Sequence, residues 1–147
     1  MIPFNKKDRN VKKLSRFWKY IGMEIAIMPV DEHDKIMSIT SHLPHLIAFT
    51  IVNTAFKIDI EKKKELINFS AGGFKDFTRI GSSDPKMWTD IFISNNKYLI
   101  STIDDFINDL KNFKELIKKN NLNEIFELLK QTKDIRKSIL KSNKLKR

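Results

Sequence analysis

Two polar stretches interrupt an otherwise apolar pattern, and they contain the residues best able to do chemistry. The first is Ser41-His42-Leu43-Pro44-His45, which follows the pair His33-Asp34. His42 and His45 are three residues apart, so they share one face of a helix if Pro44 does not separate them. A hydroxyl group and two imidazoles on a buried helix need hydrogen-bond partners or a ligand. We favour a substrate pocket lined by these side chains. Hydrogen-bonded core histidines and a metal site are the alternatives, and no third metal ligand has clear spacing.

The second stretch is Ala71-Gly-Gly-Phe-Lys-Asp-Phe-Thr-Arg79, which contains two of the four glycines. The adjacent pair Gly72-Gly73 predicts a tight turn or a close approach of the backbone to another group. It is not a dinucleotide-binding fingerprint, because no strand precedes it and no third glycine is in register. Asp76 and Arg79 are three residues apart. They form either a weak surface ion pair or a site in which Arg79, oriented by Asp76, binds a carboxylate.

A third group of residues marks the start of another helix. Asp84 can cap this helix, and Pro85 takes its first position, where proline is tolerated. Met87 and Trp88 follow directly. These two side chains either form a wall of the same pocket or belong to the apolar core, and the sequence favours neither interpretation.

The composition limits the class of protein that can carry these residues. The chain has 147 residues, 41% of them hydrophobic, and 28 Lys+Arg against 18 Asp+Glu give a net charge of +10. That is one domain's worth of chain, long enough to bury a core. The absence of cysteine excludes disulfides, thiolate metal sites and cysteine nucleophiles. The basic residues are spread out and poor in arginine, so nucleic-acid binding is disfavoured. We expect no membrane span, no signal peptide and a cytoplasmic location.

The first 28 residues contain the only α/β pattern in the chain. Asp8 can cap a helix over residues 9–21, and Gly22 is a natural end for it. Residues 23–28 predict a short strand that ends at Pro29, and Met1-Ile2-Pro3 resembles the tail of another. A lone strand is not stable in water. This segment is therefore expected to be the last strand, helix and strand of an α/β sheet whose body is missing, or else a local hairpin or cap.

After Pro29 the pattern is helical throughout. Helices are predicted from about residue 31 to 56, central and buried but kinked at Pro44, then over 60–70, 85–119 and, after Asn120-Asn121, 122–141. A helix of about 35 residues would be roughly 50 Å long, more than a domain of this size can cover. We therefore expect a partner subunit along its heptad seam, which comprises Leu99, Ile103, Phe106, Leu110, Phe113 and Ile117.

Taken together, these motifs resemble the C-terminal helical domain of the prephenate dehydrogenase (prephenate/arogenate dehydrogenase) family. The resemblance rests on His33-Asp34, the SHLPH stretch at 41–45, Gly72 to Arg79, and Asp84-Pro85-x-Met87-Trp88-x-Asp90-Ile91, in this order. It implies a mainly α fold. Residues 1–29 would be the remnant of a nucleotide-binding Rossmann domain, and residues 30–147 would be a helical substrate-cleft and dimerisation domain.

The resemblance also implies an activity and a site. The family oxidatively decarboxylates prephenate or arogenate with NAD or NADP on the route to tyrosine, which is a possible inhibitor, and its helical domain forms a homodimer. By motif, Arg79 corresponds to the arginine that binds a substrate carboxylate. Ser41, His42 and His45 correspond to cleft residues near the ring and side chain. Gly72, Asp76 and Trp88 correspond to further cleft and interface positions.

Two departures from the family pattern concern the missing half. The glycine-rich nucleotide loop and the segment with the catalytic histidine are both absent from this sequence. The chain alone is therefore expected neither to bind NAD nor to turn over. It would be either a fragment of a longer product or a split subunit completed by another chain. A non-catalytic helical module that dimerises through residues 85–119 is the alternative function.

Overall fold

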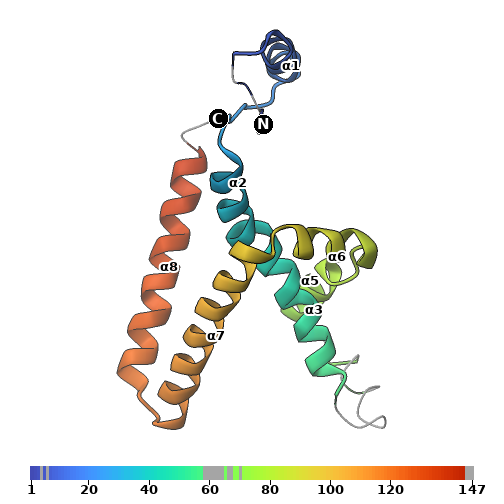
Figure 1. The fold of residues 1–147 in the computed structure, drawn as a ribbon. Coiled ribbons are helices and arrows are strands. Elements are labelled where there is room, and N and C mark those ends of the chain that lie inside the picture. The colour runs from blue at the N-terminus through green and yellow to red at the C-terminus, as the bar shows by residue number, and fades with distance from the viewer. Residues whose placement is uncertain (4, 6, 58–64, 66–67, 70, 145–147) are drawn as a thin grey trace. The chain divides into compact units, whose positions relative to one another are not determined.

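The computed structural model describes residues 1–144 except positions 4, 6, 58–64, 66–67 and 70 (Figure 1). Within these residues every regular element is a helix, so the predicted mainly α fold is confirmed. In chain order the helices are α1 (Arg9–Tyr20), α2 (Val30–Met37), the π-helical segment η1 (Ser38–His42), α3 (Leu43–Ala55), α5 (Gly72–Ile80), α6 (Pro85–Ser94), α7 (Asn96–Lys118) and α8 (Leu122–Lys144). The helix predicted over 60–70 falls largely outside the described residues.

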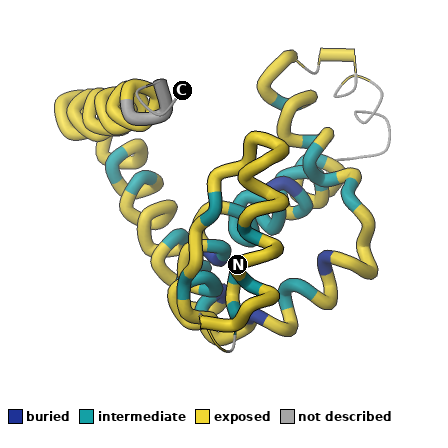
Figure 2. The backbone as a smooth tube through the Cα atoms, turned by 90° about the horizontal axis from the view of Figure 1, so that it is seen from above, coloured by how far each residue is buried: buried dark blue, intermediate teal, exposed yellow. Residues whose placement is uncertain are grey.

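The chain divides into two compact units, Met1–Ile103 and Asp104–Arg147, and the division falls inside α7. Each unit is described by itself. Buried positions are few in the described residues, and most of the backbone carries exposed or half-buried side chains (Figure 2). The predicted boundary between residues 1–29 and 30–147 stays a prediction.

Helix α1 begins and ends where its capping residues predict. The Asp8 carboxylate accepts a hydrogen bond from the backbone N–H of Asn10 at 2.7 Å. After the last turn, Gly22 adopts a left-handed conformation with a φ of 86°, and the N–H of Met23 donates to the carbonyl of Trp18 at 2.9 Å. This is the pattern of a helix closed by a left-handed glycine.

The prediction of strands on either side of α1 is wrong. Within the described residues no strand forms, and contact between the two segments is limited to Met1. The amino group of Met1 donates to the carbonyl of Ala26 at 2.7 Å, and the N–H of Met28 donates to the carbonyl of Met1 at 3.2 Å. Two such bonds resemble one step of a parallel ladder. A strand requires the ladder to continue, and here the pairing ends after that step.

Pro44 interrupts the next helical segment, as predicted. Proline has no N–H to donate, so the backbone hydrogen bonds must rearrange around it. They do so in η1, where the N–H of Leu43 reaches back five residues to the carbonyl of Ser38. A π-helical turn of this kind inserts one extra residue into a helix and is common at functional sites. Both His42 and His45 lie beside this irregularity.

The prediction that this segment is a buried central helix is wrong for the chain taken by itself. Only Ser38 and Ala48 are buried in it, whereas Ile36 and Ile39 are exposed. By length and composition alone, Val30–Ala55 is also apolar enough to cross a membrane, which the sequence analysis did not expect. Core helices of soluble proteins meet the same criterion, so the finding assigns no membrane role.

The single long helix predicted from residue 85 to 119 is also not supported. It is divided at Asn95, whose φ of −109° and ψ of 30° lie outside the helical region. Along the predicted heptad seam, Leu99 is 3% exposed, but Leu110 and Ile117 are 53% and 57% exposed. The seam therefore does not form a continuous buried stripe within the chain.

The break predicted at Asn120-Asn121 is present and separates α7 from α8. Asn120 has a left-handed φ of 51°, and the N–H of Asn121 donates to the carbonyl of Leu116 at 3.0 Å. The side-chain oxygen of Asn121 then accepts from the N–H of Glu124 at 3.3 Å, which caps α8. Asparagine tolerates both roles, because it enters the left-handed region readily and its short side chain bonds to nearby backbone.

The glycines do not act where the sequence predicted. Gly72 and Gly73 lie in the first turn of α5 with negative φ, and a Cβ atom on either would meet nothing within 4 Å. The expected tight turn at this pair is therefore wrong, and no described residue approaches the pair closely. The close approach occurs at Gly81 instead, where a Cβ atom would lie 3.2 Å from the backbone oxygen of Ala48 in α3.

Gly73→Ala and Gly81→Ala should have opposite effects on the free energy of unfolding. At Gly73 the new methyl group stands in open space and restricts the unfolded chain, so we expect a gain of about 0.4–1 kcal/mol. At Gly81 it presses on the backbone of α3, and we expect a loss of about 1 kcal/mol. Urea denaturation followed by circular dichroism measures both. Equal gains in the two variants would contradict the close contact of Gly81 with α3.

Candidate functional site

The structure brings three of the predicted site residues together around one indole ring. The imidazole of His45 stacks on Trp88, with ring centroids 3.7 Å apart and planes inclined by 21°. His42 meets the same indole edge-on, with a centroid distance of 6.3 Å and an interplanar angle of 77°. Trp88 is 6% exposed. The ring of Phe92 also packs against it, with the two ring centroids 5.4 Å apart. The two histidines therefore contact the same buried core residue, and their role in lining a substrate pocket stays a prediction.

His42 is held by the residue at the break between α6 and α7. The side-chain nitrogen of Asn95 donates to the carbonyl of Asp34 at 2.8 Å and lies 3.1 Å from Nδ1 of His42. Asn95 is 5% exposed. Sequence analysis did not identify this residue. The available signal was the pair Asn95-Asn96 inside an apolar helical pattern, since asparagine is a poor helix former.

His45 and Ser41 are linked one turn apart. Nδ1 of His45 lies 2.8 Å from the carbonyl oxygen of Ser41, and because a carbonyl only accepts, this nitrogen carries the proton. The hydroxyl of Ser41 makes no hydrogen bond to any described residue and is half-buried. In most of the other described helices, Ser and Thr hydroxyls donate to backbone carbonyls, as Thr40 does to Ile36 at 2.8 Å. The Ser41 hydroxyl therefore remains available to a ligand.

Two buried polar atoms in the described residues have no partner, namely Nε1 of Trp88 and Oδ1 of Asn95. Buried polar atoms are nearly always hydrogen-bonded, so each such exception calls for a physical reason. Both residues contact His42. The polar groups that the fold leaves unsatisfied are thus concentrated at the candidate site.

The pKa of His42 is lowered from its ordinary value. Burial of the imidazole is the largest cause, because it penalises the charged form. The carboxylate of Asp34 acts in the opposite direction, while His33 and His45 lower the pKa further. Asp34 is itself engaged by Nδ1 of His33 at 2.9 Å. His42 is therefore favoured in its neutral form.

Polar contacts between α2–η1 and the start of α7 position this region. The contacting residues have the same spacing in both segments, at positions 31, 34 and 38 in one and 95, 98 and 102 in the other. Each pair joins residues more than 60 positions apart. The contacts are Tyr98 hydroxyl to Asp31 carboxylate at 2.9 Å, Asn95 amide to Asp34 carbonyl at 2.8 Å, and Ser38 hydroxyl to Thr102 hydroxyl at 3.0 Å. Ser38 is 1% exposed, and its hydroxyl also donates to the carbonyl of Lys35 at 2.8 Å, so this hydroxyl is satisfied without access to water.

The remaining predicted residues lie on α5. Gly72, Asp76 and Arg79 are all exposed, and in the described part of the chain no ion pair joins Asp76 to Arg79 and no hydrogen bond joins either side chain to the histidines. Their roles in a substrate site stay predictions. No group of three His, Cys, Asp or Glu side chains in this part of the chain is arranged to hold a metal ion.

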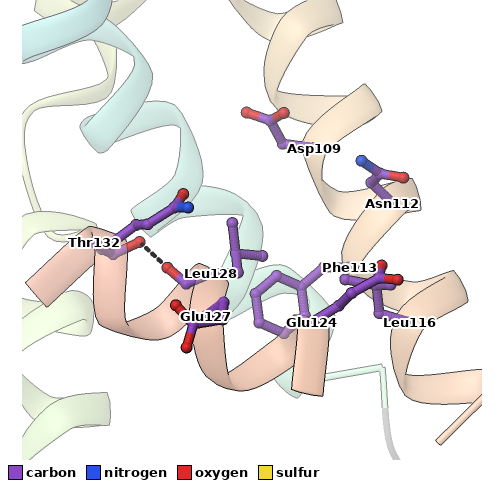
Figure 3. Close-up of a pocket in the computed structure, with 9 residues that line it drawn as sticks. Asp109, Asn112, Phe113, Leu116, Glu124, Glu127, Leu128 and Thr132 are labelled. Carbon is purple, nitrogen blue, oxygen red and sulfur yellow. Dashed lines mark hydrogen bonds between the residues drawn. The ribbon is translucent and has the colours of Figure 1, made fainter. Parts of the chain in front are cut away.

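A groove lies in the other unit, between the C-terminal part of α7 and α8 (Figure 3). Its volume is about 450 Å³. Carboxylates of Asp109, Glu124 and Glu127 surround apolar side chains that include Phe113 and Leu128. None of the predicted site residues lines this groove.

Comparison with known proteins places these features in a family. A family model described as "Prephenate dehydrogenase, dimerization domain" matches residues 29–131. Cyclohexadienyl dehydrogenase of Zymomonas mobilis is 32% identical over 123 residues, which cover 84% of this chain and 42% of that protein. Prephenate dehydrogenase of Bacillus subtilis is 31% identical over 138 residues, which cover 92% of this chain and 37% of that protein.

Solved structures agree with the sequence matches. Prephenate dehydrogenase from A. aeolicus in complex with hydroxyphenyl propionate and NAD+ is 37% identical, with a TM-score of 0.83 over 94% of this chain and 48% of that one. Synechocystis arogenate dehydrogenase is 24% identical, with a TM-score of 0.80 over 93% of this chain and 50% of that one. This second similarity supports a shared fold and nothing more. The family resemblance drawn from the motifs is confirmed. The chain spans half the length or less of these relatives.

The lowered pKa of His42 predicts how its contribution to stability depends on pH. Below about pH 6.5 the unfolded chain takes up a proton that the folded chain resists, so the free energy of unfolding falls as the pH drops through 6.5 towards the lower folded pKa. Above that pH window the imidazole is neutral in both the folded and the unfolded chain, so its titration no longer changes the free energy of unfolding. We expect His42→Gln to lose less stability than the wild type between about pH 7.5 and 5.5.

Chemical denaturation at each pH measures this difference. His33→Gln serves as the control, because it keeps His42 and its contacts with Asn95 and Trp88. The control should retain most of the wild-type pH dependence. An identical pH dependence in wild type and His42→Gln would show that the imidazole titrates equally in the folded and unfolded chain.

Proposed function

The chain belongs to the prephenate dehydrogenase dimerization-domain family, and we propose that it forms the substrate-cleft and dimerising part of an enzyme that oxidatively decarboxylates prephenate or arogenate. The observation that supports this most directly is the cluster of His42, His45 and Trp88, with the free hydroxyl of Ser41 beside it. It holds, against a buried indole, polar groups that can bind the ring and side chain of a small acid.

The described residues do not form a site for the nicotinamide cofactor of the A. aeolicus relative. A dinucleotide needs a glycine-rich turn between a strand and a helix N-terminus. Here no strand precedes α5 within the described residues, and Gly72 and Gly73 lie inside the helix. We therefore propose that NAD or NADP is bound by a part of the enzyme outside these 147 residues, that the chain by itself is inactive, and that the complete enzyme works in the cytoplasm.

Arg79 is proposed as the cation that binds a substrate carboxylate. Its guanidinium is exposed on the last turn of α5, and no ion pair engages it within the described part of the chain. A guanidinium can hold a carboxylate through two parallel hydrogen bonds, which a lysine cannot match. Exposure keeps this charge hydrated until a ligand arrives.

Dimerisation is proposed to cover the apolar surface of the second unit. Leu110, Ile117, Phe126 and Leu129 are 53%, 57%, 63% and 55% exposed on α7 and α8. Large exposed apolar side chains grouped on two neighbouring helices mark interaction surfaces in soluble proteins. The match to a dimerization-domain model supports a second copy of the chain as the partner. The same surface would serve a non-catalytic interaction module if the cleft binds no aromatic acid.

Arg79→Ala should weaken binding of hydroxyphenyl propionate about ten- to a hundredfold, because a hydrogen bond to a charged group contributes about 1.5–3 kcal/mol. Isothermal titration calorimetry of the 147-residue chain measures the dissociation constant. Arg136→Ala removes an exposed arginine from α8 and should leave the affinity unchanged. An unchanged affinity for Arg79→Ala would remove this residue from the site, and no binding by the wild type would favour the interaction module.

Leu110→Glu should convert a dimer into monomers, because it places a charge in an apolar interface. Asn108→Glu is the matched control, since it adds the same charge at another exposed position of α7. Sedimentation velocity over a range of concentrations measures the oligomeric state. A monomeric wild type, or a Leu110→Glu variant that dimerises like the control, would contradict an interface on this surface.

A further inference from the structure

We propose that Asn95 is a positioning residue that holds His42 with its proton on Nε2, so that His42 offers the substrate an uncharged hydrogen-bond donor. The inference rests on the proposed function, because the acceptor it names is an oxygen of the aromatic ring acid. It goes beyond that function by assigning a task to a residue that contacts no substrate itself.

The amide of Asn95 has only one orientation that suits its neighbours. The carbonyl of Asp34, 2.8 Å away, can only accept a hydrogen bond. The atom facing it must therefore be the amide nitrogen. A flipped amide would place two oxygens against each other at that distance, in a position that is 5% exposed and cannot call on water.

The orientation of the amide fixes the proton on His42. The second N–H of Asn95 points to Nδ1 of His42 at 3.1 Å, so Nδ1 must accept. A neutral imidazole that accepts at Nδ1 carries its proton on Nε2. In the described structure Nε2 makes no hydrogen bond and is not among the fully buried atoms without a partner, so its N–H is left without a partner inside the described part of the chain.

His45 carries its proton on the opposite ring nitrogen from His42, so the two imidazoles complement each other. Its Nδ1–H donates to the carbonyl of Ser41 at 2.8 Å, so its Nε2 is an acceptor when the ring is neutral. Two imidazoles on the same indole therefore present one donor and one acceptor. A ligand with a carboxylate or carbonyl near His42 and a hydroxyl near His45 matches this arrangement.

The surroundings of His42 agree with an uncharged donor. Protonation of Nδ1 would set an N–H against the N–H of Asn95, and the amide cannot turn without losing Asp34. Burial of the ring lowers its pKa, and the charged and titratable groups that act on it are Asp34, His33 and His45. Only Asp34 favours the charged form, and His33 occupies its carboxylate at 2.9 Å.

Asn95→Asp tests the proposal with an isosteric change. A carboxylate at this position would accept from Nδ1–H, so His42 should move its proton to Nδ1 or become doubly protonated. Long-range proton–nitrogen NMR correlations of the histidine rings in the full chain report which nitrogen carries the proton. Asn96→Asp is the matched control, since it places the same charge one residue further on at an exposed position.

We expect Nε2–H at His42 in the wild type and the control, a switch in Asn95→Asp, and an affinity for hydroxyphenyl propionate about tenfold lower in that variant only. Nδ1–H at His42 in the wild type would overturn the proposal without any variant. A switched proton with unchanged affinity would overturn the role toward the ligand. If the wild type shows Nε2–H but binds no hydroxyphenyl propionate, the role toward the ligand and the proposed function fail together, whereas the assignment of the proton stands.

Discussion

The hydrogen bond from the buried amide of Asn95 to the carbonyl of Asp34 is the contact on which the first unit depends. It lies at the point where α6 ends and α7 begins. On one side of this break Trp88 contacts the histidines, and on the other side Tyr98 and Thr102 bond to α2 and η1. Asn95 itself lies between the two groups of contacts and bonds to both Asp34 and His42.

A second irregularity, at Pro44, complements the first. The missing N–H of proline leaves the carbonyl of Thr40 without its usual helical donor, and η1 redistributes the bonds so that Leu43 reaches Ser38. His42 is the last residue of η1, and His45 lies in the first turn of α3. Both histidines are therefore placed by a local rearrangement of the backbone. Together the two irregularities bring an asparagine, two histidines and a tryptophan to one place.

Local chemistry explains what the sequence could predict. Several helix ends are fixed by residues that act on backbone groups only a few positions away, so the local sequence predicts them. These residues are Asp8, Gly22, Asp84 and Asn120. The break at Asn95 was missed because its partner, Asp34, is 61 residues away. The strands at residues 1–3 and 23–28 were overpredicted, since β-propensity does not supply a ladder. The glycine prediction failed for a related reason: only the packing of α5 on α3 distinguishes Gly81 from Gly72.

The candidate site separates charge from burial. A cation at the half-buried position of His42, beside an indole and an amide, would lose part of its hydration. His42 avoids that cost, because Asn95 fixes it as a neutral donor and burial lowers its pKa. Arg79, proposed to bind a carboxylate, keeps its permanent charge at an exposed position where water solvates it. Recognition of an anionic ring acid would then combine an exposed cation for attraction with half-buried dipoles for orientation.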